Sequence, residues 1–213
     1  MSEAELTTPE FRLTDIEELR GEQNYFNKIK RIEGEDKLWK QLQSFPSSQA
    51  AQEYISRTPS KRGDKLSAFL PATRYIIKQG VDKVSVIAVA KEIHGNRLDK
   101  VGSDLSTDAL SQLDTFVSES LIIYEQEGIC PGINLKNFIL ADDQKLYYID
   151  SEPCPPYNLE PFEVAHAREQ RLLRTFGEDA KNKFPDTWDW IENHRVENYK
   201  KAQSEAKKRR RAA

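Results

Sequence analysis

The sequence predicts a mixed α/β fold, and three stretches of the chain carry this prediction. Between Thr107 and Glu127, apolar residues recur every three or four positions, which is typical of a helix. Residues 74–80 and 83–93 are rich in β-branched residues and flank a short turn, as paired strands do. Residues 138–142 and 145–150 contain short apolar runs on either side of a polar turn, as in a β-hairpin. Strands, a long helix and a hairpin together indicate the α/β class.

The remaining segments carry weaker patterns. Residues 11–40 mix short apolar clusters with charges, which favours strands and turns. Residues 47–57 begin with a serine that can cap a helix and continue with good helix formers, so we expect a short helix. Residues 94–99 are typical of a connector, and the proline-rich residues 153–161 exclude regular structure. Helical composition returns from about Phe162 onward.

Composition limits the classes of protein. The 32 basic and 35 acidic side chains give a net charge of −3, so no whole-molecule field favours nucleic acid. The chain has no apolar run long enough to span a bilayer and no signal peptide at its first residues. Cys130 and Cys154 are too few for a disulfide scaffold and lack metal-ligand spacing. We therefore expect an intracellular protein, cytoplasmic or nuclear, without a membrane partner.

One ordered set of features points to chemistry. Asn137 follows the predicted long helix and a loop, and Asp150 ends the predicted hairpin thirteen residues later. This order resembles the catalytic core of the protein-kinase-like superfamily, in which a helix leads into a loop patterned H-x-D-x-x-x-x-N and a hairpin presents a metal-binding Asp. Upstream, VSVIAVAKEIHGNRLDKV (84–101) resembles the strand-to-hinge passage of small-molecule kinases such as the aminoglycoside and choline phosphotransferases.

The resemblance implies a minimal two-lobed fold of the α+β kind, with a small mixed N-terminal lobe and a helical C-terminal lobe. Only 63 residues follow Asp150, which is short for the substrate-binding helices of a full protein kinase. The segments implied are a flexible leader (1–10), a small lobe (11–90), a hinge (91–98), a helical lobe (99–205) and a basic tail (206–213).

The resemblance also implies ATP and Mg²⁺ as ligands. Asn137 and Asp150 would hold the metal, because Mg²⁺ prefers hard oxygen ligands. Glu92 and Ile93, with Gly95 beside them, would form the hinge that binds adenine through backbone groups. Nucleotide and an unidentified protein or small-molecule substrate are the partners that follow.

A kinase-like small lobe also carries a phosphate-facing lysine and a glutamate partner. Lys40, in a predicted strand, is the candidate lysine, and Glu53, on the helix that follows, is the candidate partner. Lys28, Lys30 and Lys37 remain alternatives to Lys40, and the residue types favour solvated surface charges over an ion pair for Lys40 and Glu53.

The catalytic loop departs from the kinase pattern. Gly132 stands five residues before Asn137, where the catalytic Asp is expected, and Cys130 stands at the His position. The group that would accept the proton of a substrate hydroxyl is therefore missing. In addition, residues 19–25 contain only Gly21 where a kinase has a glycine-rich loop. The sequence thus favours a nucleotide-binding pseudokinase, with a working phosphotransferase and a non-catalytic scaffold of the same fold as alternatives.

Other interpretations stay open. One alternative is that Asn137 and Asp150 are ordinary turn residues, whose only role is to bond loop backbone groups. The tail Lys207–Arg211 has five consecutive cations, which suits an anionic partner or an import receptor, and equally suits a solvated helix end. The chain could also be an unrelated α/β adaptor, which would be indicated if the predicted hairpin did not pair beside the long helix.

Overall fold

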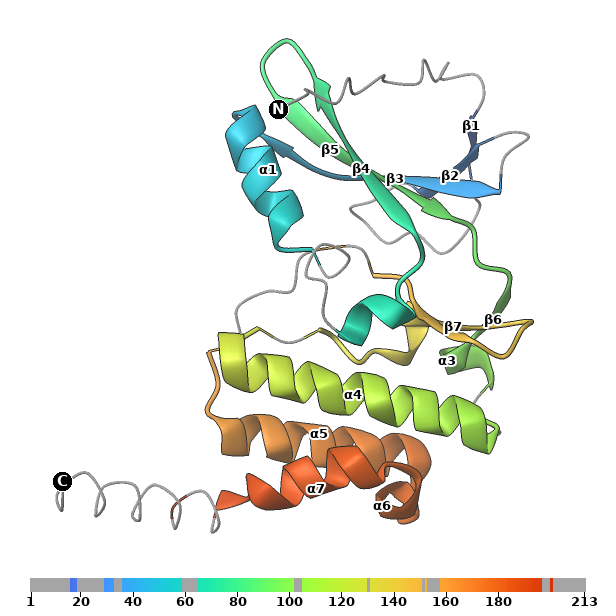
Figure 1. Ribbon diagram of the computed structural model, residues 1–213, viewed down its shortest axis with the longest axis vertical. Coiled ribbons are helices and arrows are strands. Elements are labelled where there is room, and N and C mark those ends of the chain that lie inside the picture. The colour runs from blue at the N-terminus through green and yellow to red at the C-terminus, as the bar shows by residue number, and fades with distance from the viewer. Residues whose placement is uncertain are drawn as a thin grey trace, which may run out of the picture. The chain divides into compact units, whose positions relative to one another are not determined.

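The computed structural model describes residues 16–18, 29–32, 36–58, 65–101, 105–129, 131–150, 152, 158–196 and 200. They fall into two compact units, and Figure 1 labels most of their helices and strands. Unit 1 comprises Met1–Ile93 with Ile149–Pro153, and unit 2 comprises His94–Tyr148 with Cys154–Ala213. Helices and antiparallel sheets occur together, so the predicted mixed α/β class is confirmed.

Unit 1 is built on a five-stranded antiparallel sheet with the strand order β1-β2-β3-β5-β4. Its strands are β1 (Ile16–Glu18), β2 (Ile29–Ile32), β3 (Lys37–Phe45), β4 (Thr73–Gln79) and β5 (Val84–Lys91). A 3₁₀ turn, η2 (Lys65–Phe69), precedes β4. The two strands expected at 74–80 and 83–93 are present and pair with each other.

Helix α1 (Ser48–Ser56) covers one face of this sheet. The side chain of Ser47 caps it by accepting a hydrogen bond from the Ala50 backbone N–H at 3.2 Å, as the sequence predicts. Strand β5 is apolar on both faces because each face packs against other residues. The core under α1 contains Ala51, Tyr75, Val84, Val86 and Ala88, and the opposite face contains Ile87 and Val89 with Trp39 and Ile76.

Unit 2 contains five helices and a small three-stranded sheet among its described residues. The helices are α3 (Leu98–Val101), α4 (Thr107–Glu127), α5 (Pro161–Phe176), α6 (Ala180–Lys183) and α7 (Pro185–Asn193). The sheet has the order β6-β7-β8, with β6 (Gly95–Arg97), β7 (Phe138–Ala141) and β8 (Leu146–Tyr148), and a 3₁₀ turn, η3 (Leu135–Asn137), precedes β7.

Helix α4 has the limits that the sequence predicts. The side chain of Ser106 accepts a hydrogen bond from the Ala109 backbone N–H at its start. Gly128 ends the helix in the left-handed conformation, with φ of 67°, and its N–H donates to the Tyr124 carbonyl. Glycine adopts this conformation without the steric cost that a Cβ imposes.

The predicted hairpin is present and packs on α4. Phe138 pairs with Tyr148 across β7 and β8, and the Phe116 ring of α4 lies 4.9 Å and 4.8 Å from these two rings. Gln112 of α4 also holds the hairpin turn, because it accepts from the Leu146 N–H and donates to the Gln144 carbonyl, each at 2.9 Å. The hairpin therefore pairs beside the long helix, which is the opposite of what an unrelated adaptor would show.

The sequence prediction of a connector at 94–99 is wrong, because these residues form regular structure. Residues 95–97 form strand β6, and α3 begins directly after it. Gly95 pairs with Ala141 of β7, at a position where a Cβ would lie only 2.2 Å from the Leu140 carbonyl oxygen. A three-residue polar strand shows no alternation of apolar residues, so its sequence carries no strand signal.

Helix α7 is joined to α4 at both ends. At its start, the Asp114 carboxylate of α4 accepts backbone hydrogen bonds from Asp186 and Thr187. At its end, Glu125 of α4 accepts from Trp190 Nε1 at 3.0 Å and lies 2.7 Å from His194 Nε2. Helix α7 is thus fixed by polar contacts that sequence periodicity does not reveal.

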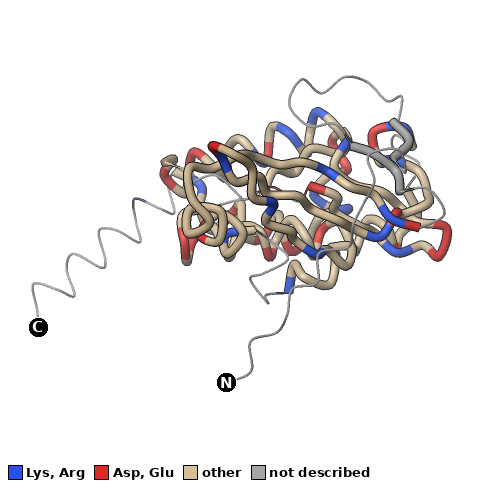
Figure 2. The backbone as a smooth tube through the Cα atoms, turned by 90° about the horizontal axis from the view of Figure 1, so that it is seen from above, with Lys and Arg blue, Asp and Glu red and all other residues tan. Residues whose placement is uncertain are grey.

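Charges are mixed along the chain. Figure 2 shows Lys and Arg interspersed with Asp and Glu over the described backbone. None of the helices in the described part of the chain is both long and apolar enough to cross a membrane. The predicted leader at 1–10 and basic tail at 206–213 lie outside the described residues.

Candidate functional site

Lys40 lies in the middle of the unit 1 sheet. It pairs with Ile29 of β2 on one side of β3 and with Ala88 of β5 on the other. Its Nζ lies 3.1 Å from Oε1 of Glu152, and the side chains of Lys40 and Glu152 are 20% and 46% exposed. A central strand therefore places one ammonium group beside a carboxylate that belongs to the segment following β8.

Asp150 shapes that segment. Its Oδ1 accepts the backbone N–H of Glu152 at 3.2 Å, a turn in which an Asp side chain bonds the backbone two residues further on. This is the local turn role that the sequence left open for Asp150. The same turn presents the Glu152 side chain to Lys40, so unit 1 gathers one cation and two carboxylates.

Tyr54 is the residue of α1 that lies near these carboxylates. Burial raises the pKa of its hydroxyl well above the ordinary value of 10.0, and the charges of Glu152, Tyr75 and Asp150 raise it further. Its ring packs on Phe45 at 4.9 Å. A neutral hydroxyl, which can donate a hydrogen bond, is thus kept close to two acidic groups.

Glu53 does not make the predicted pair with Lys40. Its side chain is exposed and accepts a hydrogen bond from Gln49 Nε2 at 3.3 Å, and the described residues contain no Lys40–Glu53 ion pair. Successive helix residues are rotated by about 100°, so Glu53 points to solvent where Tyr54 points inward. The partner of Lys40 is Glu152, which the sequence analysis did not consider.

The predicted hinge residues differ in the hydrogen bonds that their backbone groups make within the described part of the chain. The Glu92 N–H donates to the Asp36 carbonyl at 3.1 Å and is therefore occupied. For Ile93, none of the described residues supplies a backbone hydrogen bond. Gly95 belongs to strand β6, where its backbone faces Leu140 and Ala141.

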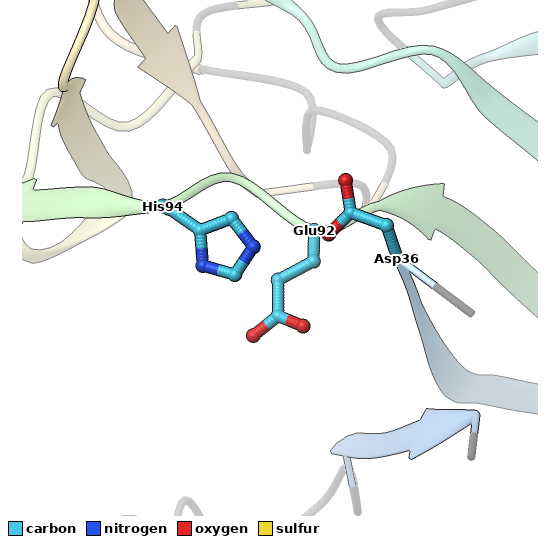
Figure 3. A group of neighbouring side chains, drawn as sticks. All are labelled: Asp36, Glu92 and His94. Atoms are coloured by element: carbon cyan, nitrogen blue, oxygen red, sulfur yellow. The ribbon is translucent and has the colours of Figure 1, made fainter. Parts of the chain in front are cut away.

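Near the hinge, Asp36, Glu92 and His94 place their ligand atoms within 4.8 Å of one another (Figure 3). Sequence spacing could not indicate this group, because Asp36 lies far from the other two along the chain. Exposed acidic groups of this kind are common without an ion, so the group is not by itself a metal site.

Asn137 and Gly132 lie in the loop between α4 and β7, in unit 2. The Asn137 N–H donates to the Asn134 carbonyl at 2.8 Å, and the Asn134 side chain accepts from the Lys136 N–H, so the loop ends in the turn η3. Around Gly132, a Cβ would meet nothing within 4 Å. The missing side chain at this position is therefore not explained by lack of space.

Arg168 of α5 contacts this loop, and sequence reasoning did not identify it. It is buried, at 6% exposure, and its Nη2 donates to the Pro131 carbonyl at 3.3 Å. Its only sequence signal is a cation within the apolar pattern of a helix. The contact fixes the backbone immediately before Gly132.

Two of the alternative lysines lie in the described part of the chain. Lys30 lies on β2, and Lys37 is exposed at the start of β3. Outside the described residues lie Gly21, Lys28, Cys130, Cys154 and Lys207–Arg211.

No protein-family model and no curated protein matches the chain. Solved structures similar to it include WbdD with a kinase inhibitor, at 15% identity and a TM-score of 0.44, which covers 81% of this chain and 44% of that one. A higher-resolution WbdD structure matches at 14% identity, TM-score 0.43, covering 78% and 43%. A third, described as the bifunctional kinase-methyltransferase WbdD, matches at 13% identity, TM-score 0.43, covering 79% and 42%.

The chain thus spans less than half the length of these WbdD structures. Within unit 1, a sheet carries Lys40 on a central strand and one helix on its face. Within unit 2, a long helix is followed by a loop that ends in Asn137 and then by a hairpin.

Proposed function

We propose that the chain is a kinase-like nucleotide-binding protein, a pseudokinase or an atypical phosphotransferase, that binds ATP with Mg²⁺. The observation that supports this best is the placement of Lys40 beside the Glu152 carboxylate, at a turn whose backbone the Asp150 carboxylate bonds, within unit 1. An ammonium group suits phosphate oxygens, and a carboxylate suits Mg²⁺, which prefers hard oxygen ligands.

Each residue has a role in this proposal. Lys40 binds phosphate, Asp150 binds the metal, and the backbone of Ile93 binds the base beside Glu92. Asn137, in unit 2, keeps the metal-binding role that the sequence resemblance implies. Glu53 is not needed, since Lys40 has another partner.

A thermal-shift titration with ATP, with and without Mg²⁺, tests nucleotide binding. We expect the wild type to be stabilised only when both are present, by about 2.7 kcal/mol at a hundredfold excess of ligand over Kd. Asp150→Ala is expected to lose this shift, because it removes the metal carboxylate. Asp142→Ala is the matched control: Asp142 is exposed in the hairpin turn and should leave the shift unchanged.

Two results would contradict the proposal. A wild type that is not stabilised by ATP with Mg²⁺ would indicate a scaffold that keeps the fold without the nucleotide. Equal shifts in the wild type and in Asp150→Ala would show that the nucleotide binds elsewhere. An Asn137→Ala variant in the same titration tests the second metal ligand separately.

The lost catalytic carboxylate leads to a further prediction. Gly132→Asp is expected to fold like the wild type, because a side chain has open space there and the backbone is not left-handed. If the missing proton acceptor is what limits phosphotransfer, ATP hydrolysis by this variant should exceed that of the wild type by about 100-fold or more.

Phosphate release from ATP measures this effect. Gly132→Asn is the control, since it has the shape of the aspartate without its ability to accept a proton. Equal rates in the Asp and Asn variants would show that a general base at position 132 is not what the chain lacks.

A further inference from the structure

Lys40 is engaged by a residue of its own chain. The distance of 3.1 Å between Lys40 Nζ and Glu152 Oε1 is that of a charge-assisted hydrogen bond. Lys40 is the more enclosed of the two side chains, at 20% exposure against 46% for Glu152. The lysine is therefore held in the sheet, whereas the carboxylate reaches it from the more solvated side.

We propose that Glu152 is a built-in competitor of the nucleotide, whose carboxylate occupies Lys40 as a phosphate oxygen would and has to be displaced for the nucleotide to bind. The inference rests on the proposed function and adds a regulatory contact to the same site. It does not follow from the sequence resemblance, which gives a glutamate at this position no role.

The chemistry of the groups supports competition. Carboxylate and phosphate oxygens are both anionic acceptors, so they suit the same ammonium donors. They also repel each other, so a phosphate at Lys40 would favour a Glu152 side chain that has moved away. At 46% exposure, the carboxylate can leave Lys40 for water at little cost, because an ion pair this accessible to solvent contributes little stability.

The turn at Asp150 links this competition to the metal. Asp150 Oδ1 bonds the backbone N–H of Glu152 and so presents that residue to Lys40. A metal ion that takes this oxygen as a ligand would compete with the N–H for it and loosen the turn. Magnesium and nucleotide are thus expected to act in the same direction, each weakening the hold of Glu152 on Lys40.

The test is a calorimetric titration of the full chain with ATP and Mg²⁺. Glu152→Gln is expected to bind about two- to fivefold more tightly than the wild type, the range set by an exposed ion pair. Glu152→Ala should have the same effect and serves as a second variant. The gain should shrink at high salt, because screening weakens the wild-type pair. Glu178→Gln, the same charge change at an exposed turn of unit 2, should leave the affinity unchanged.

A readout without nucleotide tests the ion pair itself. Acylation of Lys40 by an amine-specific reagent, followed by mass spectrometry, should be faster in Glu152→Gln than in the wild type, because the amine is no longer held by a carboxylate. Equal labelling rates would overturn the inference, since Glu152 would then not occupy Lys40.

The outcomes separate the two proposals. If the wild type binds ATP and Glu152→Gln binds it equally or more weakly, the competitor role is overturned while nucleotide binding stands; weaker binding would make Glu152 a ligand for the metal. If neither protein binds ATP although labelling of Lys40 rises, the proposed nucleotide binding is wrong, and the competitor role is overturned with it.

Discussion

Replacement of Asp114 by alanine is expected to lower the free energy of unfolding by about 2–4 kcal/mol, because it removes a helix cap and leaves the buried N–H of Thr187 without its acceptor. Helix α7 begins after Phe184, whose side chain cannot cap it, and with Pro185, which has no N–H. The next two N–H groups, of Asp186 and Thr187, donate to the Asp114 carboxylate at 3.0 and 2.9 Å. A residue of α4 thus does what an N-cap residue normally does.

The charge of Asp114 makes part of this contribution depend on pH. Burial raises the pKa of its carboxyl above the usual value of 3.8, although the hydrogen bonds from Thr187 and Asp186 act in the opposite direction. With a raised folded-state pKa, the native protein binds the proton more tightly than the unfolded chain. The pH-dependent part of the stabilisation is therefore complete below 3.8 and is lost as pH rises through the raised value.

Denaturant unfolding of the wild type and Asp114→Ala, from acidic to neutral pH, measures both effects. The difference in free energy of unfolding between the wild type and Asp114→Ala should be large over this whole pH range and should become smaller as pH rises. Asp189→Ala is the control, because Asp189 is exposed on the same helix and its loss should change stability by less than about 0.5 kcal/mol. A difference for Asp114→Ala as small as that of the control would show that α7 does not need this cap.

The Asp114 cap shows what sequence reasoning could and could not provide. The limits of α4 coincide with the ends of its apolar periodicity, and local residues set them, with Ser106 capping the start and Gly128 ending the helix. Asp114 lies within the same helix, and in the sequence nothing distinguishes it from other polar residues of that helix. Its partners are 72 and 73 residues away, and no local pattern encodes a contact of that separation.

The residues of the candidate site also fall into those that a local pattern identifies and those that only a long-range contact identifies. Lys40 could be assigned to a strand and Asp150 to a turn from the local pattern, and the structure places them so. Glu53 was named as the partner of Lys40 from its place on the helix that follows, but its side chain is exposed and accepts from Gln49. Glu152 could not be assigned, since its ion pair with Lys40 joins residues 112 positions apart.

Replacement of Gly95 by alanine is expected to destabilise unit 2 by about 2–4 kcal/mol, through backbone strain and steric overlap. The φ of Gly95 is +154°, a conformation that residues with a side chain rarely adopt. An added Cβ would lie 2.2 Å from the Leu140 carbonyl oxygen and 2.7 Å from the Ala141 Cα. Both neighbours are backbone atoms of β7, so no side chain can rotate to relieve the overlap, and β6 has to separate from β7.

Thermal unfolding and backbone amide exchange across β6 and β7 measure this effect. Gly132→Ala is the matched control, because its Cβ would meet nothing within 4 Å, and it should leave stability within about 0.5 kcal/mol of the wild type. Equal stability of the two variants would mean that the β6–β7 pairing tolerates a Cβ. If Gly95→Ala alone is destabilised, then close backbone approach to β7 accounts for the glycine at the predicted hinge, without an adenine to require it.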